Sequence, residues 1–133
     1  MTGTGSQDEI RKLLDDMLDA MNSGDAPRLR TMLSERPGAI HIGTDAEEWW
    51  SSGQLVDDVA AAGGGGDIRV VTDDVDVHVQ GDSAWVEGRG RFTRADGAER
   101  PVRMTGMFAR EAGQWKLVQS HASIAVPNAD IFG

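Results

Sequence analysis

Apolar positions recur every three or four residues through the first part of the chain, which is the spacing of one helix face. They predict a helix with a single apolar stripe, formed by Ile10, Leu13, Leu14, Met17, Leu18 and Met21. Ser6 and Glu9 have the spacing of an N-terminal capping box, and Gly24 fits a C-terminal stop. A shorter helix follows, which begins near Asp25 and Pro27.

From residue 67 onward the apolar positions alternate with a period of two, as in strands. Short turns containing glycine separate four such segments and predict an antiparallel meander. A slip in the alternation at residues 72–74 predicts a bulge. Between the two halves, "AIHIG" predicts one short strand, "GQLVDDVAAA" predicts a helix, and the glycines at residues 63–66 predict a flexible loop.

Helices followed by a meander predict an α+β fold, in which a curled antiparallel sheet of four long strands and one short strand packs on N-terminal helices. The chain has 133 residues, which fits a single domain. We expect this domain to span residues 1–133, with flexible tails at residues 1–6 and 129–133.

The sheet should present one apolar inner face to the helices. Strict alternation along the last strand places Trp115, Leu117, Gln119, His121 and Ser123 on that face. The neighbouring strands add to this face Val86, Gly88, Gly90, Phe92, Val102, Met104, Gly106 and Phe108. The two glycines beside Phe92, Gly88 and Gly90, should leave empty volume and let the sheet curl. Polar groups that converge in an apolar hollow indicate a ligand site. The alternative is a structural histidine whose hydrogen bonds are satisfied in the core.

The opposite, convex face mixes arginines with a tryptophan and a methionine. Arginine and aromatic residues are favoured at protein interfaces. We therefore expect a homodimer through this face, whose candidate residues are Trp85, Arg89, Arg91, Arg103, Thr105 and Met107. The alternative is a solvated face that carries a stray tryptophan.

Composition narrows the range of partners. The net charge of -9 disfavours nucleic acid and anionic membranes, because both are negatively charged. The chain contains no cysteine, so disulfides, thiolate metal sites and cysteine nucleophiles are excluded. No apolar run approaches the ~20 residues of a membrane span, and the N-terminus lacks the features of a signal peptide. We expect a cytoplasmic protein.

Two segments, "RMTGMFAREAGQWKLVQSHASIAVPN" and "GTDAEEWWSSGQL", resemble the nuclear transport factor 2-like superfamily. Within it, the chain is similar to SnoaL-like and ketosteroid-isomerase-like small bacterial proteins and to the association domain of calcium/calmodulin-dependent kinase II. The resemblance covers residues 7–128 and implies a cone-shaped half-barrel with a pocket at its open end, usually as a homodimer. This fold hosts isomerases, cyclases, dehydratases, hydrolases, binding proteins and oligomerisation modules.

The residue inventory limits the chemistry that the resemblance implies. The chain has no tyrosine, so the tyrosine-dependent sites of ketosteroid isomerase and of scytalone dehydratase are not available. An Asp-Arg-Asp site of the limonene epoxide hydrolase type would need an arginine on the inner face. His121 remains as a candidate base, with Asp45 as its orienter or as a second acid or base. The alternative role of Asp45 is the N-cap of a helix over "AEEWW", with Glu47 and Glu48 in its first turn.

Three functions are therefore open. The first is a binding module for a small, mostly apolar molecule, with a pocket shaped by Trp49, Phe92, Met104, Phe108 and Trp115 and a ligand oriented by Gln119, His121 and Ser123. The second is a cofactor-independent isomerase, cyclase or dehydratase that uses His121 with Asp45. The third is an association module without ligand chemistry. We expect neither a cofactor nor a metal, because the three histidines lack the close spacing of metal ligands.

Overall fold

The computed structural model describes residues 3–63 and 67–133. Residues 1–2 of the expected tail and residues 64–66 of the expected glycine loop lie outside the described residues. The described helices are α1 (Gly3–Ser23), α2 (Ala26–Arg30), α3 (Ser52–Ala62) and the 3-10 helix η1 (Asn128–Asp130). The strands are β1 (Ile40–Ile42), β2 (Trp49–Trp50), β3 (Ile68–Gln80), β4 (Ser83–Arg94), β5 (Glu99–Glu111) and β6 (Gln114–Ser123). The predicted α+β class is confirmed.

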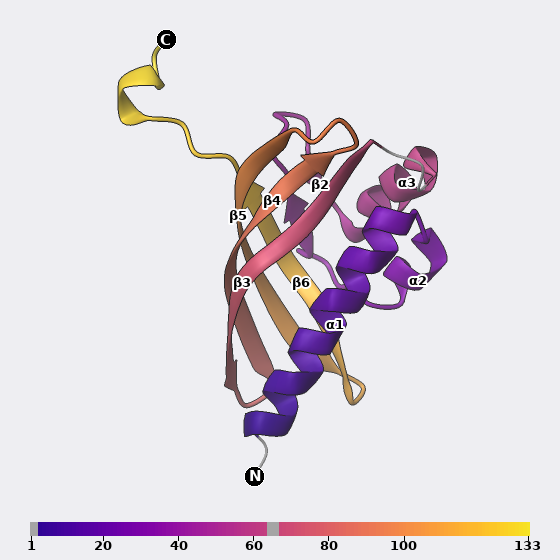
Figure 1. Cartoon of the computed structure of the whole chain (residues 1–133). Coiled ribbons are helices and arrows are strands. Elements are labelled where there is room, and N and C mark those ends of the chain that lie inside the picture. The colour runs from indigo at the N-terminus through magenta and orange to yellow at the C-terminus, as the bar shows by residue number, and fades with distance from the viewer. Residues whose placement is uncertain (1–2, 64–66) are drawn as a thin grey trace.

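One six-stranded sheet has the order β2-β1-β6-β5-β4-β3. The four long strands form the predicted antiparallel meander, while β1 runs parallel to β6. The two-residue strand β2 was not predicted, and it pairs with β1 as a small hairpin at the edge of the sheet. Figure 1 shows the sheet curling, with α1 lying along β3 and with the C-terminal segment projecting away from the body.

The predicted bulge in β3 is present between Thr72 and Asp74. Here the sheet curls so strongly that β3 passes close over β4. A Cβ atom on Gly90 would lie 2.2 Å from the Val71 carbonyl oxygen, which no side chain tolerates. Gly90 therefore permits the curl, as predicted, but the expected empty volume above it is filled by the backbone of β3.

A second bulge, in β6, was not predicted. Met107 pairs with Gln119 and Phe108 pairs with Leu117, so Val118 is an extra residue without a partner on β5. The extra residue reverses the facing of every residue that follows it. Trp115 and Leu117 lie on the inner face as predicted, but the inner-face placement of Gln119, His121 and Ser123 is wrong.

Two predicted helix starts are also corrected. Helix α1 begins at Gly3, before the predicted Ser6 cap, and the buried Ser6 hydroxyl instead accepts a 3.4 Å hydrogen bond from Arg110. Asp25 caps α2 as expected, because its carboxylate accepts from the Arg28 N–H. Helix α3 begins after a capping box made by Ser51 and Gln54. No helix forms over "AEEWW", because these residues turn the chain and then enter β2.

The core lies between the inner face of the sheet and the three α-helices. Its fully buried side chains include Ile10 on α1, Leu29 on α2 and Phe108 on β5. Arg89, Arg91 and Arg103 lie on the outer face, as the alternation predicted. Arg100, on the same face of β5 as Val102, is the arginine of these strands that borders the inner cavity, and it is exposed. Among the described helices, none has the length and apolar character needed to cross a membrane.

Candidate functional site

A cavity of about 590 Å³ lies inside the cone, between the helices and the inner face of the sheet. This volume is in the range of small-molecule sites. Apolar side chains from both layers form most of its wall, among them Leu14, Met17, Leu18, Met21, Trp50, Leu55, Val59, Val86, Phe92, Val102, Met104, Phe108 and Leu117. Thr44, Asp58 and Arg100 also border the cavity and are exposed, so they mark where it meets solvent.

The structure brings some of the predicted wall residues together at this cavity. Phe92, Met104 and Phe108 line it. Trp49 does not, because its side chain is 64% exposed, and its neighbour Trp50 takes the inward position in the hairpin. Trp115 does not line the cavity either, because it is buried in the core with the Arg110 guanidinium carbon 4.4 Å from its ring centre.

The predicted catalytic pair is not assembled. His121 pairs with Thr105 in the sheet and is exposed on the outer face. Asp45 is exposed in the turn between β1 and β2, where its carboxylate accepts from the Glu47 N–H at 3.0 Å. This bond makes Asp45 the organiser of a tight turn rather than a helix cap. Among the described residues, no hydrogen bond or ion pair joins His121 to Asp45.

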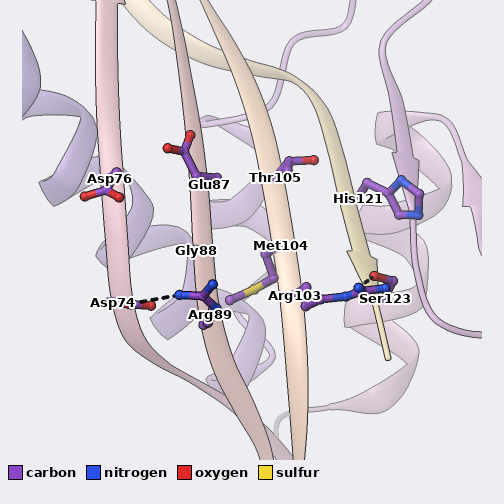
Figure 2. A pocket seen from close by; sticks show the side chains of 10 residues that line it. All are labelled: Asp74, Asp76, Glu87, Gly88, Arg89, Arg103, Met104, Thr105, His121 and Ser123. Atoms are coloured by element: carbon purple, nitrogen blue, oxygen red, sulfur yellow. Dashed lines mark hydrogen bonds and ion pairs between the residues drawn. The ribbon is translucent and has the colours of Figure 1, made fainter. Parts of the chain in front are cut away.

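Two of the polar residues predicted for the pocket, His121 and Ser123, line a different hollow, although His121 also borders the cone cavity. Figure 2 shows this groove of about 450 Å³ on the outer face, with His121 and Ser123 on one side and acidic residues on the other. Arg103 donates to the Ser123 hydroxyl at 3.3 Å, and Arg89 lies 3.7 Å from the Asp74 carboxylate. The groove is thus a mixed-charge surface in which Asp74, Arg89 and Arg103 already have partners within the chain.

The buried polar side chain at the cone cavity is His41, which was not among the predicted site residues. His41 on β1 is 3% exposed and borders the cavity. Its Nδ1 lies 2.9 Å from the Ser120 hydroxyl, and its Nε2 lies 3.0 Å from the Ser52 hydroxyl. Ser120 borders the cavity as well, because the bulge at Val118 turns it inward.

The direction of each hydrogen bond in this chain follows from counting protons. The Ser52 hydroxyl donates its single hydrogen to the Ser34 carbonyl at 2.6 Å, so toward His41 it can only accept. His41 Nε2 must therefore carry a hydrogen. Burial lowers the pKa of His41 from 6.5 to about 4, so the ring is neutral near pH 7 and Nδ1 is a bare acceptor. It follows that the Ser120 hydroxyl donates to Nδ1.

Ser34, at the end of this series of hydrogen bonds, is fixed by further contacts. Ser34 is fully buried, its N–H donates to the Leu117 carbonyl at 2.8 Å, and its hydroxyl donates to Glu111 at 2.7 Å. Glu111 in turn forms an ion pair with Arg36 at 2.7 Å. These bonds hold the Ser34 carbonyl in place and thereby fix the orientation of Ser52 and His41.

One signal in the sequence could have revealed His41. It lies between two isoleucines in a period-two segment, so it must face opposite to them. The alternation alone does not show which face of the strand is buried. That depends on the partner strand, and β1 pairs with β6 only in the folded protein. No group of three or more metal-binding side chains occurs among residues 3–63 and 67–133.

The family of SnoaL-like domains matches residues 10–127. The chain belongs to this family. It therefore shares the nuclear transport factor 2-like cone, in agreement with the resemblance of its last two strands. Among curated proteins, none matches the sequence at a significant level.

Solved structures agree on the fold. A nuclear transport factor 2-like protein of unknown function from Pseudomonas putida KT2440 has a TM-score of 0.82 at 19% identity, covering 94% of this chain and 90% of that one. A proposed dehydratase of the same family from Streptomyces avermitilis has a TM-score of 0.76 at 19% identity, covering 92% and 98%. The association domain of C. elegans CaMKII has a TM-score of 0.74 at 16% identity, covering 90% and 96%. At these identities the similarity shows the fold alone.

Proposed function

We propose that this SnoaL-like domain binds a small, mostly apolar molecule inside the cone. The observation that carries the proposal is a cavity of about 590 Å³ whose mostly apolar wall includes a hydrogen-bonded polar pair, the buried His41 and the half-buried Ser120. Apolar walls contribute affinity through the hydrophobic effect, and a few fixed polar groups orient the ligand. This arrangement is the one expected of a binding site.

The same pair supports binding better than acid–base chemistry. A general base works best when its pKa lies near the working pH, and burial lowers the pKa of His41 to about 4. The predicted alternative, proton exchange between His121 and Asp45, has no support from their positions, since one lies on the outer face and the other in an exposed turn. The role that fits the buried His41 is to orient Ser120, whose hydroxyl oxygen is the polar handle for a ligand.

Titration with N-phenyl-1-naphthylamine tests the proposal, because this neutral probe becomes strongly fluorescent in apolar surroundings. We expect saturable binding by the natural chain. Ala122 borders the cavity on the same face as Ser120, so Ala122→Phe should fill the space and abolish the signal. Ala109→Phe is the matched control, because Ala109 pairs with Ser83 and Lys116 on the outer face of the same sheet.

Two results would contradict the proposal. One is the absence of a saturable signal from the natural chain, and the other is an equal reduction of the signal by the two phenylalanine variants. Circular dichroism of both variants shows whether each one is folded, so that a lost signal reports the cavity and not the fold.

We also propose that the outer face of the sheet mediates self-association. Trp85 is 39% exposed and Met107 is 45% exposed, and they lie opposite each other on β4 and β5. The arginines around them, Arg89, Arg91 and Arg103, supply the polar rim that interfaces use. The similarity of the cone to an association domain of CaMKII supports the same view.

Light scattering on the eluting protein tests this second proposal. We expect the natural chain to elute as a dimer and the double variant Trp85→Ala, Met107→Ala to elute as a monomer. Trp49→Ala is the control, because Trp49 is more exposed but lies on the edge strand β2. A monomeric natural chain, or a double variant that remains dimeric, would contradict the proposal.

A further inference from the structure

The hydrogen bonds of the buried His41 determine what the cavity offers to a ligand beside that residue, away from the exposed Thr44 and Arg100 where the cavity meets solvent. Ser120 has one hydrogen, and that hydrogen is donated to His41 Nδ1 at 2.9 Å. The lone pairs of the Ser120 oxygen are what remain for a molecule in the cavity. His41 has no free nitrogen, because its Nε2 hydrogen is donated to Ser52 at 3.0 Å. The pair therefore presents an acceptor to the cavity and no donor.

We propose that the cavity selects apolar ligands that carry a hydrogen-bond donor, such as a hydroxyl, a phenol or an N–H group, over ligands of the same shape that carry only acceptors. This inference rests on the proposed function, since it names the class of molecule that the cavity binds. Glu48 also borders the cavity, and its carboxylate adds a second acceptor.

Reversing the preference would require reversing the whole chain of hydrogen bonds. Ser120 can donate to a ligand only if His41 donates to Ser120 from Nδ1, which leaves Nε2 as an acceptor. Ser52 would then have to donate to Nε2 and give up its 2.6 Å bond to the Ser34 carbonyl. That carbonyl is buried, and a buried acceptor without a partner is costly. The anchored Ser34 thus sets the polarity of Ser120, which is three hydrogen bonds away.

This dependence gives the inference a distinctive consequence. In Ser52→Ala the Nε2 atom of His41 loses its hydrogen-bond acceptor. No other hydrogen bond of the described residues then keeps the ring hydrogen on Nε2. His41 can then carry its hydrogen on Nδ1 and donate to Ser120, which frees the Ser120 hydrogen for a ligand. A substitution at Ser52 should therefore change ligand preference, although Ser120 and His41 lie between Ser52 and the proposed ligand contact.

Two probes of nearly equal shape test the inference, 2-naphthol as a donor and 2-methoxynaphthalene as an acceptor only. Calorimetric titration gives the ratio of their dissociation constants for each protein. We expect Ser120→Ala to lower the preference for 2-naphthol by about fivefold to tenfold, the effect of one net hydrogen bond. Ser52→Ala should lower it too, by strengthening the binding of 2-methoxynaphthalene. Ser123→Ala, on the outer face of the same strand, should leave it unchanged.

The possible failures are distinguishable. If neither probe binds the natural chain, the cavity-binding proposal is overturned, and the inference with it. If both bind with the same ratio in the natural chain, Ser120→Ala and Ser52→Ala, the donor preference alone is overturned. If Ser120→Ala does not fold, Ser52→Ala decides the matter, since its helix keeps the Ser51 capping box.

Discussion

Replacing His41 by glutamine removes the one histidine that the fold holds in its neutral form by burial. The folded chain keeps the pKa of His41 near 4, while the unfolded chain returns it to 6.5. Between these values the unfolded state binds more protons than the folded state, so the free energy of unfolding falls as the pH is lowered. The stabilisation is complete above pH 6.5 and is lost progressively as the pH approaches 4.

The size of the effect follows from that difference in pKa. Each tenfold change in proton concentration across the interval contributes about 1.4 kcal/mol. Between pH 7 and pH 4.5 the ideal linkage is about 2.5 kcal/mol. His41 borders the cavity, where water can screen the charge of the protonated ring, so we expect about 2 kcal/mol.

Urea unfolding at pH 7 and pH 4.5 measures this difference in natural chain and variant. The carboxylates titrate in both proteins, so their contribution cancels when the two are compared. Between pH 7 and pH 4.5 the free energy of unfolding should fall by about 2 kcal/mol more in the natural chain than in His41→Gln. An equal loss in both proteins would refute the reasoning, because it would mean that His41 is not held neutral by the fold.

Two further predictions concern the fold that shapes the cavity. Gly90→Ala should lower the free energy of unfolding by at least about 2 kcal/mol, because the new Cβ would lie 2.2 Å from the Val71 carbonyl oxygen. The control Gly5→Ala, with open space around it on α1, should raise the free energy of unfolding by about 0.8 kcal/mol. Urea unfolding of both variants checks this, and equal effects would argue against the close passage of β3. Ser51→Ala should cost about 1 kcal/mol in thermal or urea unfolding, because it removes the hydrogen bond to the Gln54 N–H; an unchanged stability would mean that α3 does not depend on its cap.

The two bulges show what a sequence pattern can and cannot reveal. In β3 the valines alternate at residues 75, 77 and 79, out of phase with Ile68 and Val70 before the slip, so the extra residue is visible in the sequence. In β6 the residues after Val118 are polar or small on both faces, so no apolar signal marks the change of facing. The element order and the inner faces of β4 and β5 were predictable, but the side chains at the end of β6 were not.

The turn before α3 and the site itself could not be predicted from the sequence, for a related reason. The two tryptophans looked like part of a helix, but pairing with β1 makes them a strand and turns only Trp50 inward. His41 and Ser120 are far apart in the sequence and become neighbours only because β1 joins β6 in parallel. Such a contact depends on tertiary pairing, and no local pattern encodes it.

The central claim is that an apolar molecule enters the cone, and the methionine methyl groups report on it directly. Met17, Met21 and Met104 line the cavity, while Met107 lies on the outer face. In protein labelled with carbon-13 at these methyls, titration with N-phenyl-1-naphthylamine should shift the three cavity signals through the ring current of the probe and leave Met107 in place. Shifts at Met107 alone, or none at the three cavity methyls, would contradict the account.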